Sequence, residues 1–359
     1  MLTITFTVED LARTRLAVSP LWEIVASIRL LRTPRSQTFH QEWAQLTKAR
    51  IDRAGVDLGL LFDLVDPQVW YMADFLTPPP RSPLPDLTAD LSALRRVSAS
   101  QLRTDLDVLS YARKHPIGSL AEASLPRRLR PARPEDLPSA AVADLYSDPE
   151  AGLERLAEQL QTYWELAIAP HWGRIRALLE SDLLYRGRRL GQAGHTGLFE
   201  DLAESVKWRN GSLSIKHRRF HGVRNLAGEG LLMTPSAFVW PTVFSSTIPP
   251  WQPTLTYPAR GVATLWANSS RTASAGIAGV LGRSRAELLA QLDTPRSTTE
   301  LATRTGMSAG GVSQHLGTLR SGGLVTPHRV GRSVLYARTA VAEALLEAAD
   351  RPEDDPALR

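Results

Sequence analysis

The chain has 359 residues and a formal net charge of +5, and 43% of its residues are hydrophobic against 22% that are charged. This length exceeds what one hydrophobic core usually supports, so we expect two or three domains. The composition is typical of a soluble globular protein, and no apolar run is long enough for a membrane helix or a secretory signal. The sequence contains no cysteine, which excludes disulfides, thiolate metal ligands and cysteine nucleophiles. We therefore expect a cytoplasmic protein.

The first hundred residues predict an α-rich unit that begins with a short strand at 4–7. A proline-dense segment at 75–87 is expected to form a loop, because proline continues neither a helix nor a central strand. Asp86 and Ser98 are expected to cap the two helices that follow this loop. Apolar residues at three- and four-residue spacing predict three earlier helices, at 20–31, 37–53 and 58–65.

The middle of the chain changes from a helical to a β-leaning composition. A second proline-rich segment, at 125–139, is expected to be an exposed loop or linker. A long helix is expected at 149–184 with a kink at Pro170, and a further helix at 197–205. Short apolar runs separated by glycine and proline then predict the strands of a small sheet, at 213–217, 230–240 and 252–258.

Near the C-terminus the sequence has the signals of a helix-turn-helix. Two segments, 282–293 and 297–306, each contain a serine three residues before a glutamate, which is the spacing of a capping box. The spacing joins Ser284 to Glu287 and Ser297 to Glu300. A glycine-containing turn then leads to Ser308, the expected cap of a second helix.

The helix after Ser308 has one apolar face and one small, polar face. Val312, Leu316 and Leu319 are expected to pack inward. The outward side chains suit a close approach to base edges in a major groove, and no acidic residue between Ser308 and Val325 would repel phosphate. The residues that we expect to face DNA are Ser308, Ala309, Gly310, Ser313, Gln314 and Thr318.

Two strands, at 325–329 and 333–337, are expected to form a β-hairpin around Gly331. Arg329 and Arg332 lie near its tip, so the hairpin is a candidate wing that contacts the phosphate backbone or the minor groove. The surrounding composition favours a polyanionic partner, because residues 264–345 contain nine arginines and four acidic residues. That surplus equals the net charge of the whole chain.

Each of these side chains also has a simpler interpretation. Ser313 and Gln314 are compatible with ordinary solvated positions on a surface helix. His315 either donates to a phosphate or packs half-buried against its own domain. Arg329 and Arg332 are solvated charges by default, and only the agreement of helices, turn and hairpin favours contact with DNA.

The segment from Met307 to Arg338 resembles the winged-helix core of ArsR-type (ArsR/SmtB-like) bacterial repressors. It has a V-S-x-H-L core, a double-glycine turn and an R-x-G-R wing, carried by Val312, Ser313, His315, Leu316, Leu319, Gly323, Leu324, Gly331, Arg332 and Tyr336. The resemblance implies a homodimer that binds double-stranded DNA at a near-palindromic operator, with its recognition helices about 34 Å apart. Metal-sensing members use paired cysteines, which this chain does not have. The N-terminal region resembles an uncharacterised domain fused ahead of such modules in actinobacterial proteins.

The resemblance and the sequence signals together predict the domain organisation. We expect a fold that is mainly α with small β elements, an α+β class. Residues 1–260 are expected to form an α-rich region with a small sheet, in one or two subdomains, for ligand sensing, dimerisation or both. Residues 261–350 are expected to form the winged helix-turn-helix, and 351–359 a disordered tail.

All nine tryptophans precede Ser284. Several of them are candidates either for an apolar effector pocket or for ordinary core packing. The candidates for a ligand site are Trp164, Trp172, Trp208, Trp240 and Trp251. His217 and His221, with His195 upstream, lack a nearby third ligand, so we expect no metal site. No cofactor is expected.

No signature of an enzyme is present, because the sequence has no Walker loop, G-x-G-x-x-G, H-E-x-x-H or G-x-S-x-G motif. We therefore expect a dimeric, DNA-binding transcription regulator of the ArsR type that is not an enzyme. An effector, where one exists, is expected to be a small molecule and not a metal. Two alternatives stay open at this point. One is a small-molecule enzyme with an appended regulatory winged helix, and the other is a protein-interaction module that has lost DNA binding.

Overall fold

The computed structural model divides the chain into two compact units, residues 1–266 and 267–359. Each unit is considered by itself. The division lies a few residues after the boundary that we expected between 260 and 261. The structure describes residues 1–33, 40–115, 118–119, 129–217, 220–266, 275–292, 295–330, 333–339, 341–342 and 345–346. The predicted tail at 351–359, Gly331 and Arg332 lie outside the described residues. In the described residues no helix is long and apolar enough to cross a membrane.

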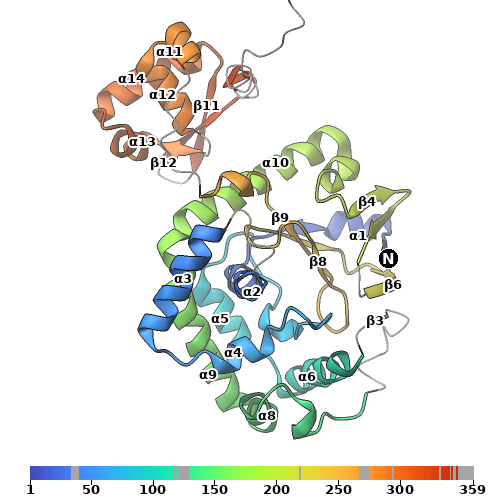
Figure 1. Ribbon diagram of the computed structural model, residues 1–359. Helices are drawn as coiled ribbons and strands as arrows, with labels where there is room; N and C mark the ends of the chain where they lie inside the picture. Colours follow the sequence, from blue (N-terminus) through green and yellow to red (C-terminus); the bar gives the residue numbers. More distant parts are fainter. Residues whose placement is uncertain are drawn as a thin grey trace, which may run out of the picture. The chain divides into compact units, whose positions relative to one another are not determined.

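The N-terminal unit is built around one nearly completely buried helix, α2 (Pro20–Leu31). Ser19 caps it by accepting a hydrogen bond from the backbone N–H of Trp22 at 3.2 Å. Helix α2 contacts helices on one side and a strand of a sheet on another, as Figure 1 shows. The other helices of the first half are α1 (Val8–Arg13), α3 (Gln41–Ala54), α4 (Gly59–Leu64), α5 (Leu87–Arg95), α6 (Ala99–Lys114) and α8 (Ala140–Ser147).

Several predicted helix starts are confirmed. Asp86 accepts a hydrogen bond from the N–H of Ala89 at the start of α5, and Ser98 forms a capping box at the start of α6. The predicted strand at 4–7 is shifted, because β1 spans Leu2–Thr5. Thr7 is not in the strand but caps α1 through the N–H of Asp10 at 3.2 Å. The local capping interaction therefore ends the strand.

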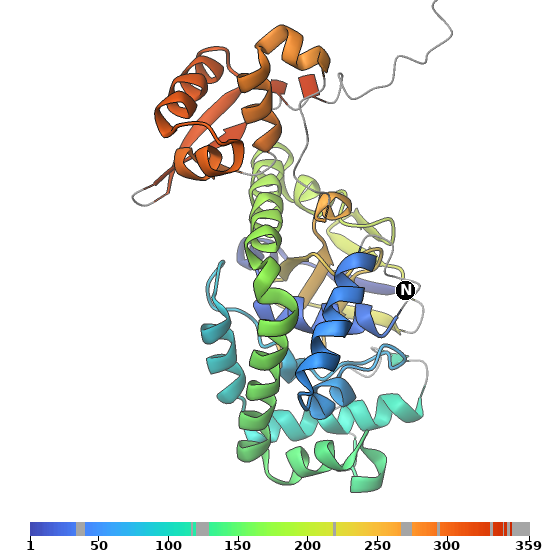
Figure 2. The ribbon, with the colours of Figure 1, turned by 60° about the vertical axis from the view of Figure 1, so that its left-hand side comes forward.

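The predicted long helix forms a rod of four consecutive helical segments (Figure 2). They are α9 (Pro149–Tyr163), the π-helical η5 (Trp164–Ile168), the 3-10 helix η6 (Ala169–His171) and α10 (Trp172–Phe199). The α-helical hydrogen bonding changes around Pro170, where a kink was predicted, because proline lacks the N–H donor. The further helix predicted at 197–205 is present only in part. The backbone is not helical at Ala193 and Gly194, and the helical residues after this break end at Phe199, so the helix begins and ends earlier than predicted.

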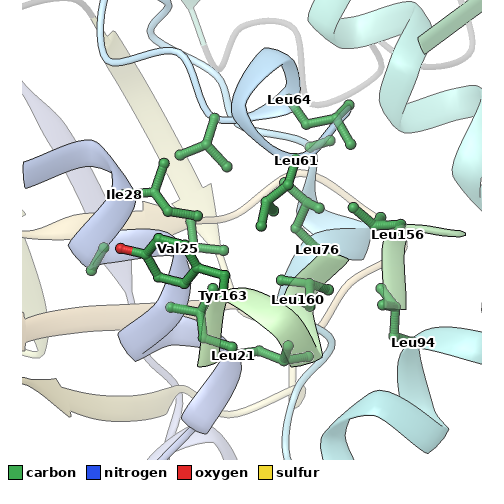
Figure 3. Close-up of a cluster of buried hydrophobic side chains, with 14 of the residues drawn as sticks. Leu21, Val25, Ile28, Leu61, Leu64, Leu76, Leu94, Leu156, Leu160 and Tyr163 are labelled. Atoms are coloured by element: carbon green, nitrogen blue, oxygen red, sulfur yellow. The ribbon is translucent and has the colours of Figure 1, made fainter. Parts of the chain in front are cut away.

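The largest core lies between α2, α9 and the helices beside them, as Figure 3 shows for fourteen of its side chains. Leu21, Val25 and Ile28 of α2 are fully buried in it, together with Leu160 and Tyr163 of α9. The Tyr163 hydroxyl also forms a hydrogen bond of 2.9 Å with Ser27 Oγ. The buried phenol is thus partnered within the core, which avoids the cost of an unsatisfied hydroxyl.

The described strands of the N-terminal unit form two sheets, where one small sheet was predicted. A five-stranded sheet has the order β3-β6-β1-β5-β4, and a four-stranded sheet has the order β2-β7-β9-β8. Strand β1 pairs in parallel with β6 and antiparallel with β5. The other strands are β2 (Arg15–Leu16), β3 (Gly118–Ser119), β4 (Val206–Arg209), β5 (Ser212–Ile215), β6 (Phe220–Asn225), β7 (Leu232–Ser236), β8 (Phe244–Ser246) and β9 (Thr254–Pro258). The remaining 3-10 helices are η2 (Asp74–Leu76), η4 (Pro134–Asp136) and η7 (Val262–Thr264).

The C-terminal unit contains four helices and a three-stranded sheet of order β10-β12-β11 in its described part (Figure 1). The helices are α11 (Ala275–Leu281), α12 (Arg283–Gln291), α13 (Thr298–Thr305) and α14 (Ala309–Ser321). The strands are β10 (Arg296–Ser297), β11 (Val325–Val330) and β12 (Ser333–Arg338). The predicted fold class, mainly α with small β elements and a C-terminal winged helix-turn-helix, is confirmed.

Candidate functional site: a helix-turn-helix surface and an aromatic pocket

The turn between α13 and α14 is defined by local hydrogen bonds. Ser297 and Glu300 form the predicted capping box, in which Glu300 Oε2 accepts from the Ser297 N–H at 2.7 Å. Gly306 ends α13 with a φ of 69°, a left-handed conformation that glycine adopts without strain. Ser308 then caps α14 by accepting from the N–H of Gly311 at 3.2 Å. Both helix starts follow the sequence prediction.

The other predicted capping box, at Ser284, is wrong. Helix α12 begins two residues earlier than a cap at Ser284 would require, at Arg283, and its N-cap is Gly282, which makes no side-chain cap hydrogen bond. Gly282 has a φ of 82°. The chain therefore enters α12 through a left-handed glycine, and Ser284 already lies inside the helix.

Helix α14 buries one face, as predicted. Val312 and Leu316 are completely buried and Leu319 is 2% exposed. They share a core with Leu301 of α13 and Leu289 of α12. This packing holds α14 although its first turn contains two glycines, each of which costs an isolated helix about 1 kcal/mol relative to alanine.

The opposite face of α14 is exposed and carries the residues that we expected to face DNA. The exposed ones are Ser308, Ala309, Gly310, Ser313, Gln314 and Thr318. Thr318 donates its hydroxyl to the backbone carbonyl of Gln314 at 3.2 Å. His315 is half-buried, a position compatible with either of the roles considered for it. The exposed face is therefore free of large side chains over its first turn.

The two adjacent glycines differ in the space around them. A Cβ built on Gly310 would have no neighbour within 4 Å, whereas one on Gly311 would lie 3.2 Å from Ser308 Oγ. Gly311 thus lies close to the capping serine. Among the residues that the structure describes, no neighbour would clash with a side chain at Gly310.

Strands β11 and β12 form the predicted hairpin. The pair is antiparallel, with Arg329 opposite Val334, and the Arg329 side chain is exposed. Arg332 lies outside the described residues. Two exposed basic residues were not among our candidates: Arg320 in the last turn of α14, and His328 on β11. Both residues lie on the two elements that carry the predicted DNA contacts, and this position in the sequence could have identified them.

The N-terminal unit contains a pocket of about 540 Å³. Its walls come from α2, the segment 67–74, the start of the β5–β6 connection and the segment 238–248. Six aromatic side chains lie in these walls: Trp22, Trp70, Tyr71, Phe238, Trp240 and Phe244. The Trp22 and Phe244 ring centroids are 6.0 Å apart. Polar and ionisable side chains, among them Asp74, Lys216 and His217, also line it. Aromatic walls together with polar groups that can orient a ligand are typical of a small-molecule site.

Of the five tryptophans considered as ligand candidates, Trp240 lies in this pocket. Trp164 and Trp172 pack against one another with ring centroids 4.8 Å apart. Trp208 packs against Phe199 in the core beneath the five-stranded sheet, and Trp251 donates Nε1 to Asp105 Oδ2 at 3.0 Å. Trp22 and Trp70, which also line the pocket, were not distinguished by any sequence signal.

Asp74 is the acidic residue of the pocket lining, and it is 7% exposed. Its Oδ1 accepts a hydrogen bond from Ser246 Oγ, and its Oδ2 accepts from the Tyr71 hydroxyl at 3.2 Å. Burial raises the pKa of Asp74 to about 7. Both of its hydrogen-bond donors are neutral hydroxyls.

His217 lies in the pocket lining and forms a hydrogen bond of 3.0 Å between Nε2 and Ser245 Oγ. Burial lowers the pKa of His217 to about 4, so the imidazole is neutral at physiological pH. Among the residues that the structure describes, no group of three or more histidine, aspartate or glutamate side chains could hold a metal ion.

Comparison with known families matches both units of the chain. Residues 1–263 match a family of unknown function (DUF5937), and residues 283–328 match a helix-turn-helix domain (HTH_20). No curated protein and no solved structure matches the chain. The helix-turn-helix match covers α12, α13, α14 and the first part of β11, and it confirms the ArsR-type resemblance together with the fused N-terminal domain.

Proposed function

Because the chain belongs to the DUF5937 family and continues into an ArsR-type helix-turn-helix domain, we propose that it is a DNA-binding transcription regulator. In this proposal a homodimer binds a near-palindromic operator in the cytoplasm, and the N-terminal unit senses a non-metal small molecule. The chain acts by binding, not by catalysis. The observation that carries the proposal is the exposed, acid-free face of α14 beside a hairpin with the exposed Arg329.

The two kinds of contact have separate roles. Ser313 and Gln314 project from the exposed face of α14, where short polar side chains hydrogen-bond base edges. Arg329 lies on the hairpin, where a guanidinium binds phosphate and sets the register of the protein on the duplex. The bare first turn at Gly310 allows the backbone to approach the groove closely, so that DNA shape contributes to specificity.

The test is a set of mobility-shift titrations on the DNA upstream of the gene and on random DNA of equal length. Gln314→Ala is expected to weaken operator binding by about 1–3 kcal/mol and random binding little. Arg329→Ala is expected to weaken both and to lower the salt slope by about 1. Arg53→Ala, an exposed arginine of α3, is the charge-matched control.

Equal affinity of the wild-type protein for operator and random DNA would contradict a sequence-specific regulator. The oligomeric state is measured in parallel by analytical ultracentrifugation, with and without operator DNA. A single dimer bound per operator is expected, because two-fold symmetry in the protein matches a near-palindromic site. One monomer bound per operator would contradict the dimer.

A further inference from the structure

The aromatic pocket contains a buried acid without a cationic partner. In the described part of the chain, Asp74 forms no ion pair, and the hydroxyls of Ser246 and Tyr71 are its side-chain partners. A second buried acid, Asp105, lies close enough to interact electrostatically with Asp74 and Tyr71, and it too is bound by neutral donors, the Phe75 N–H and Trp251 Nε1. A buried carboxylate is stable only when a counter-charge or donors offset its lost hydration.

The cationic residues of the pocket lining do not supply this counter-charge. Arg29 donates to the backbone carbonyls of Asp66 and Pro67 at 3.1 and 3.5 Å, and its guanidinium carbon lies 4.9 Å from the centre of the Phe244 ring. Lys216 is exposed, so its ammonium is hydrated. The buried carboxylate of Asp74 is therefore the charged group of the pocket that a ligand would stabilise. This favours a cation over an anion as ligand.

A second observation points to a ligand at the same place. Thr247 lines the pocket and is 2% exposed, yet its Oγ1 has no hydrogen-bond partner among the described residues. An unsatisfied buried hydroxyl costs about 1–3 kcal/mol. A ligand that carries a hydrogen-bonding group would remove this cost.

The aromatic walls complete the chemistry. The rings of Trp22, Trp70 and Trp240 line the same pocket as Asp74. Indole and phenyl faces attract cations and bury flat apolar groups. The combination of a buried carboxylate with several ring faces matches a molecule that has a positive charge and an aromatic body.

We propose that this pocket is the effector site and that it binds aromatic organic cations, with the positive charge at Asp74 and the apolar body between the tryptophans. The proposal deepens the function proposed above, and its regulatory part rests on it. The binding itself is measured without DNA, so the two proposals can fail separately.

The primary experiment is a titration of the full chain with tetraphenylphosphonium, followed by tryptophan fluorescence, with benzyltrimethylammonium as a smaller cation. All nine tryptophans lie in residues 1–266, so the signal reports on the N-terminal unit. Tetraphenylborate, an anion of nearly the same shape, is the matched control. Saturable binding of a cation at least tenfold tighter than that of the anion is expected. A dissociation constant above roughly 1 mM, the value of a weak complex, for both cations overturns the proposal. Equal affinity for the anion also overturns it.

The site is assigned with variants. Asp74→Asn, which keeps the shape of the side chain, is expected to weaken cation binding at least tenfold, whereas the exposed-acid control Asp52→Asn leaves it unchanged. If Asp74→Asn does not fold, Trp240→Ala replaces it, with a loss of at least threefold expected. Unchanged affinity in a folded Asp74→Asn protein or in Trp240→Ala overturns the assignment.

The pH dependence provides a further test, since the charge of tetraphenylphosphonium does not change with pH. Because only the ionised carboxylate attracts the cation, affinity is expected to rise about tenfold from pH 6 to pH 8 as Asp74, whose pKa is about 7, loses its proton. The titratable and charged groups around it are Tyr71, Asp105, Arg29, Lys216 and His217. His217, with a pKa of about 4, stays neutral over this range. A pH-independent affinity overturns the role of Asp74.

The regulatory part is tested by mobility shift with saturating tetraphenylphosphonium. A change of at least threefold in operator affinity is expected for the wild type and not for Asp74→Asn. Binding of the cation with no change in operator affinity overturns the effector role. Binding of the cation by a protein that binds no DNA contradicts the proposed function but supports the ligand class.

Discussion

Trp266 donates its Nε1 proton to Nδ1 of His40 at 2.7 Å, and so the last residue of the N-terminal unit is bonded to the segment just before α3. Burial lowers the pKa of His40 to about 4, which keeps Nδ1 available as an acceptor. The Trp266 ring also stacks on Trp43, with centroids 6.2 Å apart. Phe238, which lines the pocket, packs against Trp43 at 4.7 Å. The pocket wall and the end of the unit therefore share one aromatic cluster.

Trp266→Phe is expected to reduce the free energy of unfolding of the N-terminal unit by about 1–2 kcal/mol. The change keeps an aromatic ring but removes the donor, which leaves the buried His40 acceptor unsatisfied. Denaturant unfolding followed by the remaining tryptophans measures the loss. Trp208→Phe is the matched control, because Trp208 packs against Phe6 and Phe199 through its ring. Equal losses of unfolding free energy in the two variants would show that the loss comes from ring area and not from the hydrogen bond.

Glu23→Gln is expected to remove a pH dependence of stability. Glu23 is completely buried in α2 and accepts from the Ala237 N–H at 3.0 Å, and burial raises the pKa of Glu23 to about 8. Between its ordinary pKa of 4.5 and about 8, the folded state keeps a proton that the unfolded state loses. Stability therefore falls as pH rises through this window, by on the order of 2–4 kcal/mol from this group.

The measurement is thermal unfolding of wild type, Glu23→Gln and the exposed control Glu42→Gln between pH 5 and pH 8. Asp74 and Asp90, whose pKa values are also raised to about 7, and the buried His40 contribute equally to all three proteins. Their effects therefore cancel in the difference. A wild-type protein that gains stability relative to Glu23→Gln with rising pH would contradict the buried proton.

Gly310→Ala is expected to stabilise the C-terminal unit and to weaken its DNA binding. Alanine gains roughly 0.5–1 kcal/mol of helix stability, and its Cβ meets nothing within 4 Å. If the bare first turn serves close approach to DNA, the methyl group weakens operator binding at least threefold. Gly279→Ala on α11, where a Cβ also meets nothing within 4 Å, is the control and should gain stability without loss of DNA affinity. Tighter DNA binding by Gly310→Ala would overturn the close-approach argument.

Leu316→Ala is expected to destabilise the C-terminal unit by about 2–4 kcal/mol, because it leaves a cavity at a completely buried position of α14. Far-UV circular dichroism should show an earlier partial unfolding, while tryptophan fluorescence, which reports on the N-terminal unit, stays unchanged. Val280→Ala, at a side chain 78% exposed on α11, is the control. An equal shift of the fluorescence transition would indicate that the two units unfold together.

The sequence by itself determined the features that depend on residues close together in the chain. Ser98, Ser297 and Ser308 cap helices through N–H groups three residues ahead, so their roles follow from spacing alone. The apolar period of α14 likewise separated its buried face from its exposed one. Where two local signals compete, spacing is not enough, and Gly282 with its left-handed φ begins α12 before the serine predicted to cap it.

Only the tertiary structure decided the sheets and the pocket. Strand β1 pairs with β5 and β6, more than two hundred residues away, and nothing in its own sequence specifies those partners. Trp240 lines the pocket whereas Trp251 binds Asp105, although both tryptophans lie in similar proline-rich surroundings. Asp74 acquires its raised pKa from burial among segments that are distant in sequence. Long-range packing sets which side chains share a space, and that choice is made by the whole core and not by neighbours along the chain.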